Sequence, residues 1–396
     1  MNIKTRQSIW GLTLALGLLL LIAAGCGSGT EQASGNQQAN GTQQGQGSGA
    51  GSEPGGQVGT DSGDSAAGEA GSGSGEAAAP PSDITVTDSD EKAHTFAKTP
   101  EQVVILGSYP ASMFQALGLS DLVVAVDDFT KDSTAWPPFV TSLPSVGSSK
   151  TPDMEQILTL GADAVLASYI DPDVATKLEE AGVPVLSIYG YKTELIPVEL
   201  RTLGRLFGAE ERAEAYAASI ESHWALIESR AADLEETDKP TVYWESSSGA
   251  YRTFSGGTGA DPLIRMAGGI NIAGEEPVSN PQVSAEWLVE KNPDVIIKYA
   301  SSTDLGFHGG NEANLKDIRE EIVSRPGFDQ INAVQNGRVY LISNKITSDP
   351  LGPVGLTYLA KWLHPERYDD LDPTALFQDI LETYYGEPYK GEWVYE

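Results

Sequence analysis

The chain has 396 residues and a formal net charge of -31, from 56 Asp and Glu residues against 25 Lys and Arg residues. This charge excludes a nucleic acid as the expected partner, because neutralising phosphates requires a basic surface. The single cysteine has no second cysteine for a disulfide and suggests no metal site.

The N-terminal segment has the features of an export signal. Basic residues precede an apolar run over residues 9–24, which is short for a membrane span. The run ends in LIAAGC, which resembles the lipobox of bacterial lipoproteins, although Ala23 stands where leucine is usual. The resemblance implies a signal peptide at residues 1–25, a lipid such as palmitate on Cys26, and a place on the extracytoplasmic face of the cell membrane. A free thiol is the alternative.

Residues 26–82 are predicted to be a tether. The segment is rich in Gly, Ser, Gln and Ala and has almost no aliphatic or aromatic residues. Such a composition cannot bury enough apolar surface to offset chain entropy, so we expect a flexible coil that carries a folded domain above the membrane.

Residues 83–195 are predicted to form an N-terminal α/β lobe. The stretch 84–96 alternates apolar and polar residues around a turn, which indicates a hairpin. Apolar strands then alternate with helical stretches, in the order QVVILG, PASMFQALGL, LVVAVDD, a helix from Asp153, DAVLAS, DVATKLEEAG and PVLSIYG. Apolar strands separated by helices predict a largely parallel sheet covered on both faces.

Residues 196–236 are predicted to be a helical connector. No strand pattern interrupts them, and apolar residues recur at helical spacing at Ala213, Tyr216, Ala217, Ile220, Trp224, Ile227, Ala231 and Leu234. This pattern predicts one helix of about seven turns. The α/β pattern resumes over residues 237–396, which we expect to form a C-terminal lobe that ends in two helices.

Two similar stretches occur in the two lobes. EQILTLGADAVL begins at Glu155 and EWLVEKNPDVII begins at Glu286, and each places its glutamate before a predicted strand. The chain therefore offers one acid at an equivalent place in each lobe. The alternative explanation is that the first turn of a helix favours glutamate in any case.

Together with the lipobox and the connector, the stretches TPDMEQILTLGADAVLA, LIRMAGGINIAGE, VSAEWLVEKNPDVII and FDQINAVQNGRVYLIS resemble ABC-importer substrate-binding proteins. The resemblance is to the class for iron-siderophore complexes, haem and cobalamin. It implies two Rossmann-like lobes joined by one long helix, with a ligand cleft between them. It also implies a monomer without enzymatic activity that delivers a ferric siderophore, or a related metal chelate, to an ABC permease. Glu155 and Glu286 match the acids that dock on the permease in that family.

The ligand is expected beyond the carboxyl ends of the strands, where the lobes face each other. The candidate ligand-binding residues follow predicted strands and are Ser108, Tyr109, Trp136, Tyr169, Tyr189, Trp244, Tyr251, Arg252, Lys298 and Tyr299. Aromatic faces suit a flat or bulky ligand, and the cations suit its anionic edges. Ordinary packing is the alternative for each aromatic residue. A molybdate or tungstate oxyanion, bound by backbone N–H groups and hydroxyls, is the alternative ligand.

No bound metal ion or cofactor is expected. The four histidines, His94, His223, His308 and His364, do not show the spacing of metal ligands. We find no dinucleotide fingerprint, nucleophile elbow or complete phosphate loop, so a surface-tethered enzyme is a remote alternative. A tethered adhesin is another, but it gives no reason for the paired glutamates.

Overall fold

The structure is a computed structural model, and it describes residues 83–132, 136–301, 303–307 and 310–396. The first element is a hairpin of β1 (Ile84–Thr87) and β2 (Ala93–Phe96), which pair in antiparallel fashion. This confirms the hairpin predicted at residues 84–96. The signal peptide, Cys26 and the tether lie outside the described residues.

A four-stranded parallel sheet in the order β4-β3-β5-β6 forms the N-terminal lobe. Its strands are β3 (Val103–Leu106), β4 (Val123–Val126), β5 (Ala164–Ala167) and β6 (Val185–Ser187). The helices between them are α1 (Ser108–Ala116), α2 (Asp128–Asp132), α3 (Met154–Thr159) and α4 (Pro172–Glu180). Val103 and Ile105 of β3 pack in one hydrophobic cluster, while Val104 and Leu106 pack in another. Both faces of the sheet are therefore covered, as the apolar strands predicted.

The connector region contains two helices instead of one. α5 (Ile196–Phe207) ends at Gly208, which has a φ of 71°, and α6 (Glu210–Ala231) follows with 22 residues. α5 packs closely on α6, because a Cβ on Gly204 would lie 2.3 Å from the Cβ of Ala213. α6 is the predicted long helix, of about six turns, and it begins at Glu210 and ends before Leu234.

The sheet of the C-terminal lobe has the order β11-β10-β9-β7-β8. Its strands are β7 (Thr241–Glu245), β8 (Ile270–Asn271), β9 (Val295–Ala300), β10 (Val339–Ser343) and β11 (Val394–Tyr395). Its helices are α7 (Asp261–Met266), α8 (Ala285–Lys291), α9 (Glu312–Val323), α10 (Asn332–Gln335), α11 (Gly352–Leu363) and α12 (Pro373–Ile380). Only β11 runs antiparallel to its neighbour. α11 and α12 were predicted from the sequence, whereas the two-residue strand β11 was not.

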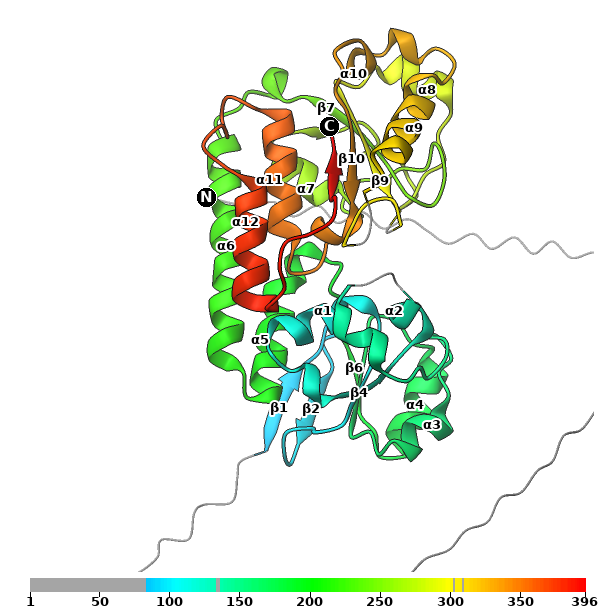
Figure 1. Cartoon of the computed structure of the whole chain (residues 1–396), viewed down its shortest axis with the longest axis vertical. Helices are drawn as coiled ribbons and strands as arrows, with labels where there is room; N and C mark the ends of the chain where they lie inside the picture. Colours follow the sequence, from blue (N-terminus) through cyan, green and yellow to red (C-terminus); the bar gives the residue numbers. More distant parts are fainter. Residues whose placement is uncertain (1–82, 133–135, 302, 308–309) are drawn as a thin grey trace, which may run out of the picture. The chain divides into compact units, whose positions relative to one another are not determined.

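The last segment of the chain ties the two lobes together. α12 continues into a π-helical turn (Leu381–Tyr385), and α11 and α12 lie alongside α6 (Figure 1). The hydroxyl of Tyr385 lies 3.1 Å from the hydroxyl of Ser112 on α1, and the Tyr384 ring stacks on Tyr216 of α6 at 3.8 Å. The predicted terminal helices therefore reach back to the first lobe. The described residues all belong to one compact unit (Glu76–Glu396), and the two-lobed α/β fold is confirmed.

Candidate functional site

The carboxyl ends of the two sheets face each other. Lys345 follows β10 in one lobe, Ser108 follows β3 in the other, and Lys345 Nζ donates to Ser108 Oγ over 2.9 Å. A second bond crosses the same boundary, from the N–H of Asp349 to the carbonyl of Gly190 over 3.0 Å. Because ligands of open α/β sheets bind beyond such strand ends, the junction between the lobes is the candidate binding site.

Aromatic side chains cover the strand ends of the N-terminal lobe. Phe129 after β4, Tyr169 after β5 and Tyr191 after β6 are 70%, 59% and 46% exposed. The Tyr191 ring centroid lies 5.9 Å from that of Tyr109 and 5.5 Å from that of Tyr189. We call Phe129, Tyr169, Tyr189 and Tyr191 the aromatic face. Large exposed apolar side chains at one edge indicate a binding surface, and these rings can stack on a flat ligand.

The Tyr189 loop is fixed by buried Glu199 on α5. Glu199 accepts hydrogen bonds from the N–H groups of Tyr189 at 2.7 Å and Gly190 at 2.9 Å, and burial raises the pKa of Glu199. The Tyr189 hydroxyl donates to Asp90, which raises the pKa of Tyr189, and Lys192 Nζ lies 3.8 Å from the ring centroid. Glu199 was not among the predicted residues, because it lies on a helix and the candidates were taken from the segments that follow strands.

A hollow of about 540 Å³ lies between β1 and α5. Its lining includes Thr85, Val198, Glu199 and Arg205. These residues belong to the hairpin and to the helix packed on it, so a ligand there would contact no residue of the C-terminal lobe. The hollow therefore does not explain the aromatic face or the bonds between the lobes.

Asp349 is a buried acid at the lobe junction. Its φ is 60°, its Oδ1 accepts the N–H of Leu351 at 2.9 Å, and its Oδ2 has no hydrogen-bond partner among the described residues. Burial raises the pKa of Asp349 to about 7. The Ser112 hydroxyl of α1 and Lys345, from the turn after β10, partly offset this rise in the pKa of Asp349. The hydroxyl groups of Tyr109, Tyr216 and Tyr385 also face Asp349.

The raised pKa of Asp349 predicts that the folded chain loses stability as the pH rises from about 4 to about 7. Over this range the unfolded chain has already lost the proton, while the native state still holds it, so deprotonation favours unfolding. The difference from the ordinary value of 3.8 corresponds to at most about 4 kcal/mol. Urea unfolding at several pH values should show this slope, and Asp349→Asn should flatten it. The control Asp317→Asn changes an exposed aspartate on α9 and should leave the slope unchanged. If Asp349→Asn kept the same slope as the parent protein, Asp349 would not be the group that causes it.

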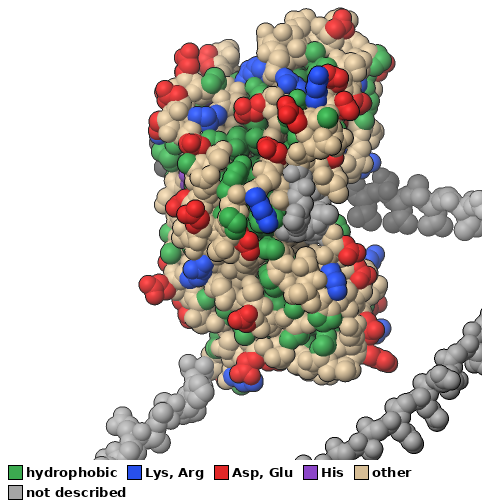
Figure 2. All heavy atoms as spheres, viewed as in Figure 1, with side chains coloured by type: hydrophobic (Ala, Val, Ile, Leu, Met, Phe, Trp, Pro, Cys, Tyr) green, Lys and Arg blue, Asp and Glu red, His purple; other side chains and the backbone are tan. Residues whose placement is uncertain are grey.

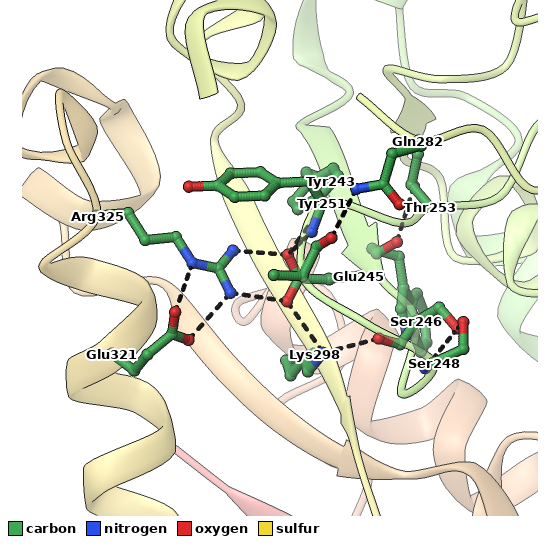
Figure 3. Close-up of polar contacts among 12 residues, drawn as sticks. Tyr243, Glu245, Ser246, Ser248, Tyr251, Thr253, Gln282, Lys298, Glu321 and Arg325 are labelled. Carbon is green, nitrogen blue, oxygen red and sulfur yellow. Dashed lines mark hydrogen bonds and ion pairs between the residues drawn. The ribbon is translucent and has the colours of Figure 1, made fainter. Parts of the chain in front are cut away.

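The C-terminal lobe holds a buried charge network at the end of β7 (Figure 3). Glu245 is fully buried and accepts two bonds from Arg325, at 2.6 Å and 3.0 Å, while Lys298 Nζ lies 3.0 Å from Glu245 Oε1. Burial alone would raise the pKa of Glu245, but Arg325 and Lys298 lower it. Lys298 also donates to the carbonyl of Ser246 at 2.7 Å. The charge of Lys298, which we predicted to meet the ligand, is therefore paired with Glu245.

The same network positions the loop that carries Arg252. The N–H of Tyr251 donates to Glu245 Oε2 at 2.8 Å, and Tyr251 has a φ of 62°, which is uncommon for a residue with a side chain. The N–H of Ser246 donates to the carbonyl of Arg252 at 2.7 Å. The Arg325 guanidinium lies 4.7 Å from the Tyr251 ring centroid. Within the part of the chain that the structure describes, the Arg252 guanidinium has no hydrogen bond or ion pair, so it is available to an anionic ligand.

Two predicted tryptophans lie in the core. Trp136 is 2% exposed and packs against Tyr385 and Trp393, and Trp244 is 1% exposed and contacts Tyr299 at 5.1 Å. The packing alternative describes both better than ligand contact does. From the same stretch as Trp136 we missed the exposed Phe129, although its place directly after β4 was a usable signal. Tyr299 lies at the lobe junction, where its hydroxyl accepts from Thr347 at 3.0 Å.

Glu155 and Glu286 occupy equivalent positions in the two lobes. Each is the second residue of a short helix, α3 or α8, and each is exposed. The strands that follow, β5 and β9, start at Ala164 and Val295, nine residues after their glutamates, and both are interior strands of their sheets. Hydrogen bonds from its own N–H and from the Ser284 hydroxyl lower the pKa of Glu286.

Among residues 83–396, apart from the undescribed positions, no group of three or more His, Cys, Asp and Glu side chains could hold a metal ion. His308 lies outside the described residues. Over the same described part, we find no helix with the length and apolar character needed to span a membrane.

The profile of the periplasmic binding protein family matches residues 103–346, from the first strand of the N-terminal lobe to the turn that carries Lys345. The chain belongs to the periplasmic binding protein family. Members of this family bind solutes for ABC transporters, which is the class that we expected from the sequence.

Two relatives and two solved structures illustrate the similarity. An uncharacterized ABC transporter substrate-binding lipoprotein, YvrC, of Bacillus subtilis is 25% identical over 72% of this chain and 87% of its own length. A cobalamin-binding protein of Halobacterium salinarum is 30% identical over 56% of this chain and 60% of its own length. The TroA-like periplasmic binding protein FepB of Veillonella parvula is 26% identical, with a TM-score of 0.69 over 79% of this chain and 99% of that one. The molybdate-bound MolA of Haemophilus influenzae, at 18% identity, shares the fold with a TM-score of 0.66 over 78% of this chain and 99% of that one.

Proposed function

We propose that the chain captures a ferric-siderophore-type complex, or a related chelate such as cobalamin or haem, between its lobes and delivers it to an ABC permease. The observation that carries this proposal is the aromatic face, which is exposed at the strand ends of one lobe, together with Arg252 of the other lobe, whose charge is unpaired within the described part of the chain. Flat or bulky chelates with anionic edges need both features. A small oxyanion would have no use for several exposed rings.

The proposal places the protein on the extracytoplasmic face of the membrane. The LIAAGC sequence supports lipid attachment at Cys26, and a relative named as a lipoprotein supports it further. Each methylene group of an acyl chain that is buried in the membrane contributes about 0.8 kcal/mol to binding, so two or more acyl chains would anchor the protein stably. The surface of the folded part fits a domain surrounded by water, because charged side chains of both signs are spread over the face shown in Figure 2.

Glu155 and Glu286 are proposed to dock on the permease. They are exposed and lie at equivalent places, one in each lobe, so together they form a two-point contact whose spacing depends on lobe arrangement. Arginines on the permease would bind such carboxylates in bidentate fashion.

A binding titration tests the choice of cargo. The full chain in detergent, titrated with ferric siderophores, haem, cobalamin, molybdate and tungstate, should bind one chelate or corrinoid saturably, as measured by intrinsic fluorescence and calorimetry. Arg252→Ala should weaken that binding about ten- to hundredfold, the effect of losing a charged hydrogen bond. Lys316→Ala, on the exposed side of α9, should leave it unchanged.

Other outcomes of the titration separate the alternatives. Binding of molybdate or tungstate alone would replace the chelate by an oxyanion and remove the role of the aromatic face. Chemical conversion of any ligand would contradict the binding-protein assignment. Unchanged affinity in Arg252→Ala would remove Arg252 from the ligand site.

A further inference from the structure

Lys345 reaches from one lobe to the other. It lies in the short turn after β10 (Asn344–Ile346), and its Nζ donates to Ser108 Oγ, at the start of α1, over 2.9 Å. Its ammonium group also lies 5.5 Å from the ring centroid of Tyr109. Lys345 is therefore placed where a ligand held between the lobes would meet both strand ends.

The positive charge of Lys345 is poorly compensated. It forms no ion pair with a described residue, in contrast to Lys298, which is paired with Glu245. The carboxyl group whose charge acts on it is Asp349, and burial raises the pKa of that group to about 7, so only about half of the molecules carry this negative charge at pH 7. Burial also lowers the pKa of Lys345. An ammonium group has three donors, and among the described residues the Nζ of Lys345 has one hydrogen-bond partner, Ser108.

The start of α1, which lies next to Lys345, brings no negative charge. The first turn of α1 has no acidic residue, and its cap makes no side-chain hydrogen bond. The N-terminus of a helix carries partial positive charge. A cation and a helix N-terminus therefore lie together at the junction, and a carboxylate, phosphate or catecholate oxygen there would be favoured by both.

We infer that Lys345 is a specificity-determining residue that binds an anionic group of the cargo while Ser108 and Tyr109 hold the same group from the other lobe. The inference rests on the proposed function and narrows it, since the preferred cargo is then an anionic complex. Arg252 and Lys345, which follow β7 and β10, supply two separate positive charges in the C-terminal lobe. The aromatic face supplies the stacking surface in the N-terminal lobe.

The test compares anionic and neutral ligands of similar size. Full-length parent, Lys345→Met and Lys345→Arg proteins are titrated with ferric enterobactin and haem, which are anionic, and with ferrichrome and haem dimethyl ester, which are neutral. The parent should prefer the anionic member. Lys345→Met should weaken its binding about ten- to hundredfold and leave the neutral member within about twofold, because only the anionic member uses the charge. Lys345→Arg should retain most of the preference.

The ratio of the affinities for the anionic and the neutral ligand distinguishes recognition of the ligand charge by Lys345 from a purely structural role of Lys345. If Lys345 only stabilised the lobe junction, Lys345→Met would weaken anionic and neutral ligands alike, and the inference would be overturned. Preference of the parent for a neutral complex would also overturn it, while the proposed function would stand. Failure of the parent to bind any chelate or corrinoid would overturn the proposed function and the inference together. Thermal unfolding of each variant checks that it is folded, and Lys316→Met serves as the matched surface control.

Discussion

Reversing Glu155 and Glu286 to arginine is expected to abolish uptake of the cargo while its binding stays at the parent level. In the proposed docking, each reversal would replace an attraction to the permease by a repulsion between like charges, which costs several kcal/mol in an interface. We therefore expect each single reversal to reduce uptake about tenfold or more. Uptake is measured in cells that make only the variant, and binding is measured on the purified protein.

Two exposed glutamates provide matched controls. Glu290 lies on α8, one turn after Glu286, and Glu180 lies at the end of α4 in the N-terminal lobe. Reversal of either control should leave uptake near the parent level, since neither shares the position of the pair. If the Glu155 or Glu286 reversals abolished ligand binding as well as uptake, these acids would belong to the ligand site or the fold, and the docking proposal would fail.

Replacing Glu245 by alanine should destabilise the folded chain by about 3–5 kcal/mol, the usual effect of removing one partner of a buried ion pair. Arg325 and Lys298 would both lose the buried carboxylate with which they form ion pairs (Figure 3). The N–H of Tyr251 would also lose its acceptor. Urea unfolding of the full chain measures the free-energy difference, with Glu245→Gln as the variant that keeps the shape.

Glu321 is the matched control, because it binds the same arginine from the surface. Its side chain is 61% exposed, and Arg325 Nη2 lies 3.0 Å from Glu321 Oε2. Glu321→Ala should destabilise by less than about 1 kcal/mol, as exposed ion pairs usually do. If Glu245→Ala and Glu321→Ala lowered the free energy of unfolding equally, the burial of Glu245 would not explain the contribution of the network to stability.

Local patterns were sufficient to predict the lobes. The strands β3 and β5 are uninterrupted apolar runs, β9 begins with one, and the buried positions of α6 fall where the helical spacing of apolar residues placed them. The equivalent positions of Glu155 and Glu286 also followed from sequence, because the repeated stretch carries its own helix start and strand. These features depend on residues close together in the chain.

The site was harder to predict, because it depends on contacts between distant segments. Nothing near Lys345 in the sequence indicates Ser108, and nothing near Glu245 indicates Arg325. The place of Phe129 directly after β4 pointed to the strand end, but the burial of Trp136 depends on its contacts with Tyr385 and Trp393, which lie far away in the sequence. The paired state of Lys298 and the unpaired state of Arg252 likewise depend on the fold.

The contacts of the C-terminal segment impose an order on folding during synthesis. The N-terminal lobe can assemble its sheet from residues 103–187 early, but Ser112 and Tyr216 meet their partners Tyr385 and Tyr384 only after nearly the whole chain has been made. β11, which completes the edge of the second sheet, comes last of all. Because contacts between residues far apart in the sequence form slowly, we expect the contacts of the C-terminal segment with α1 and α6 to form after the sheet of the N-terminal lobe.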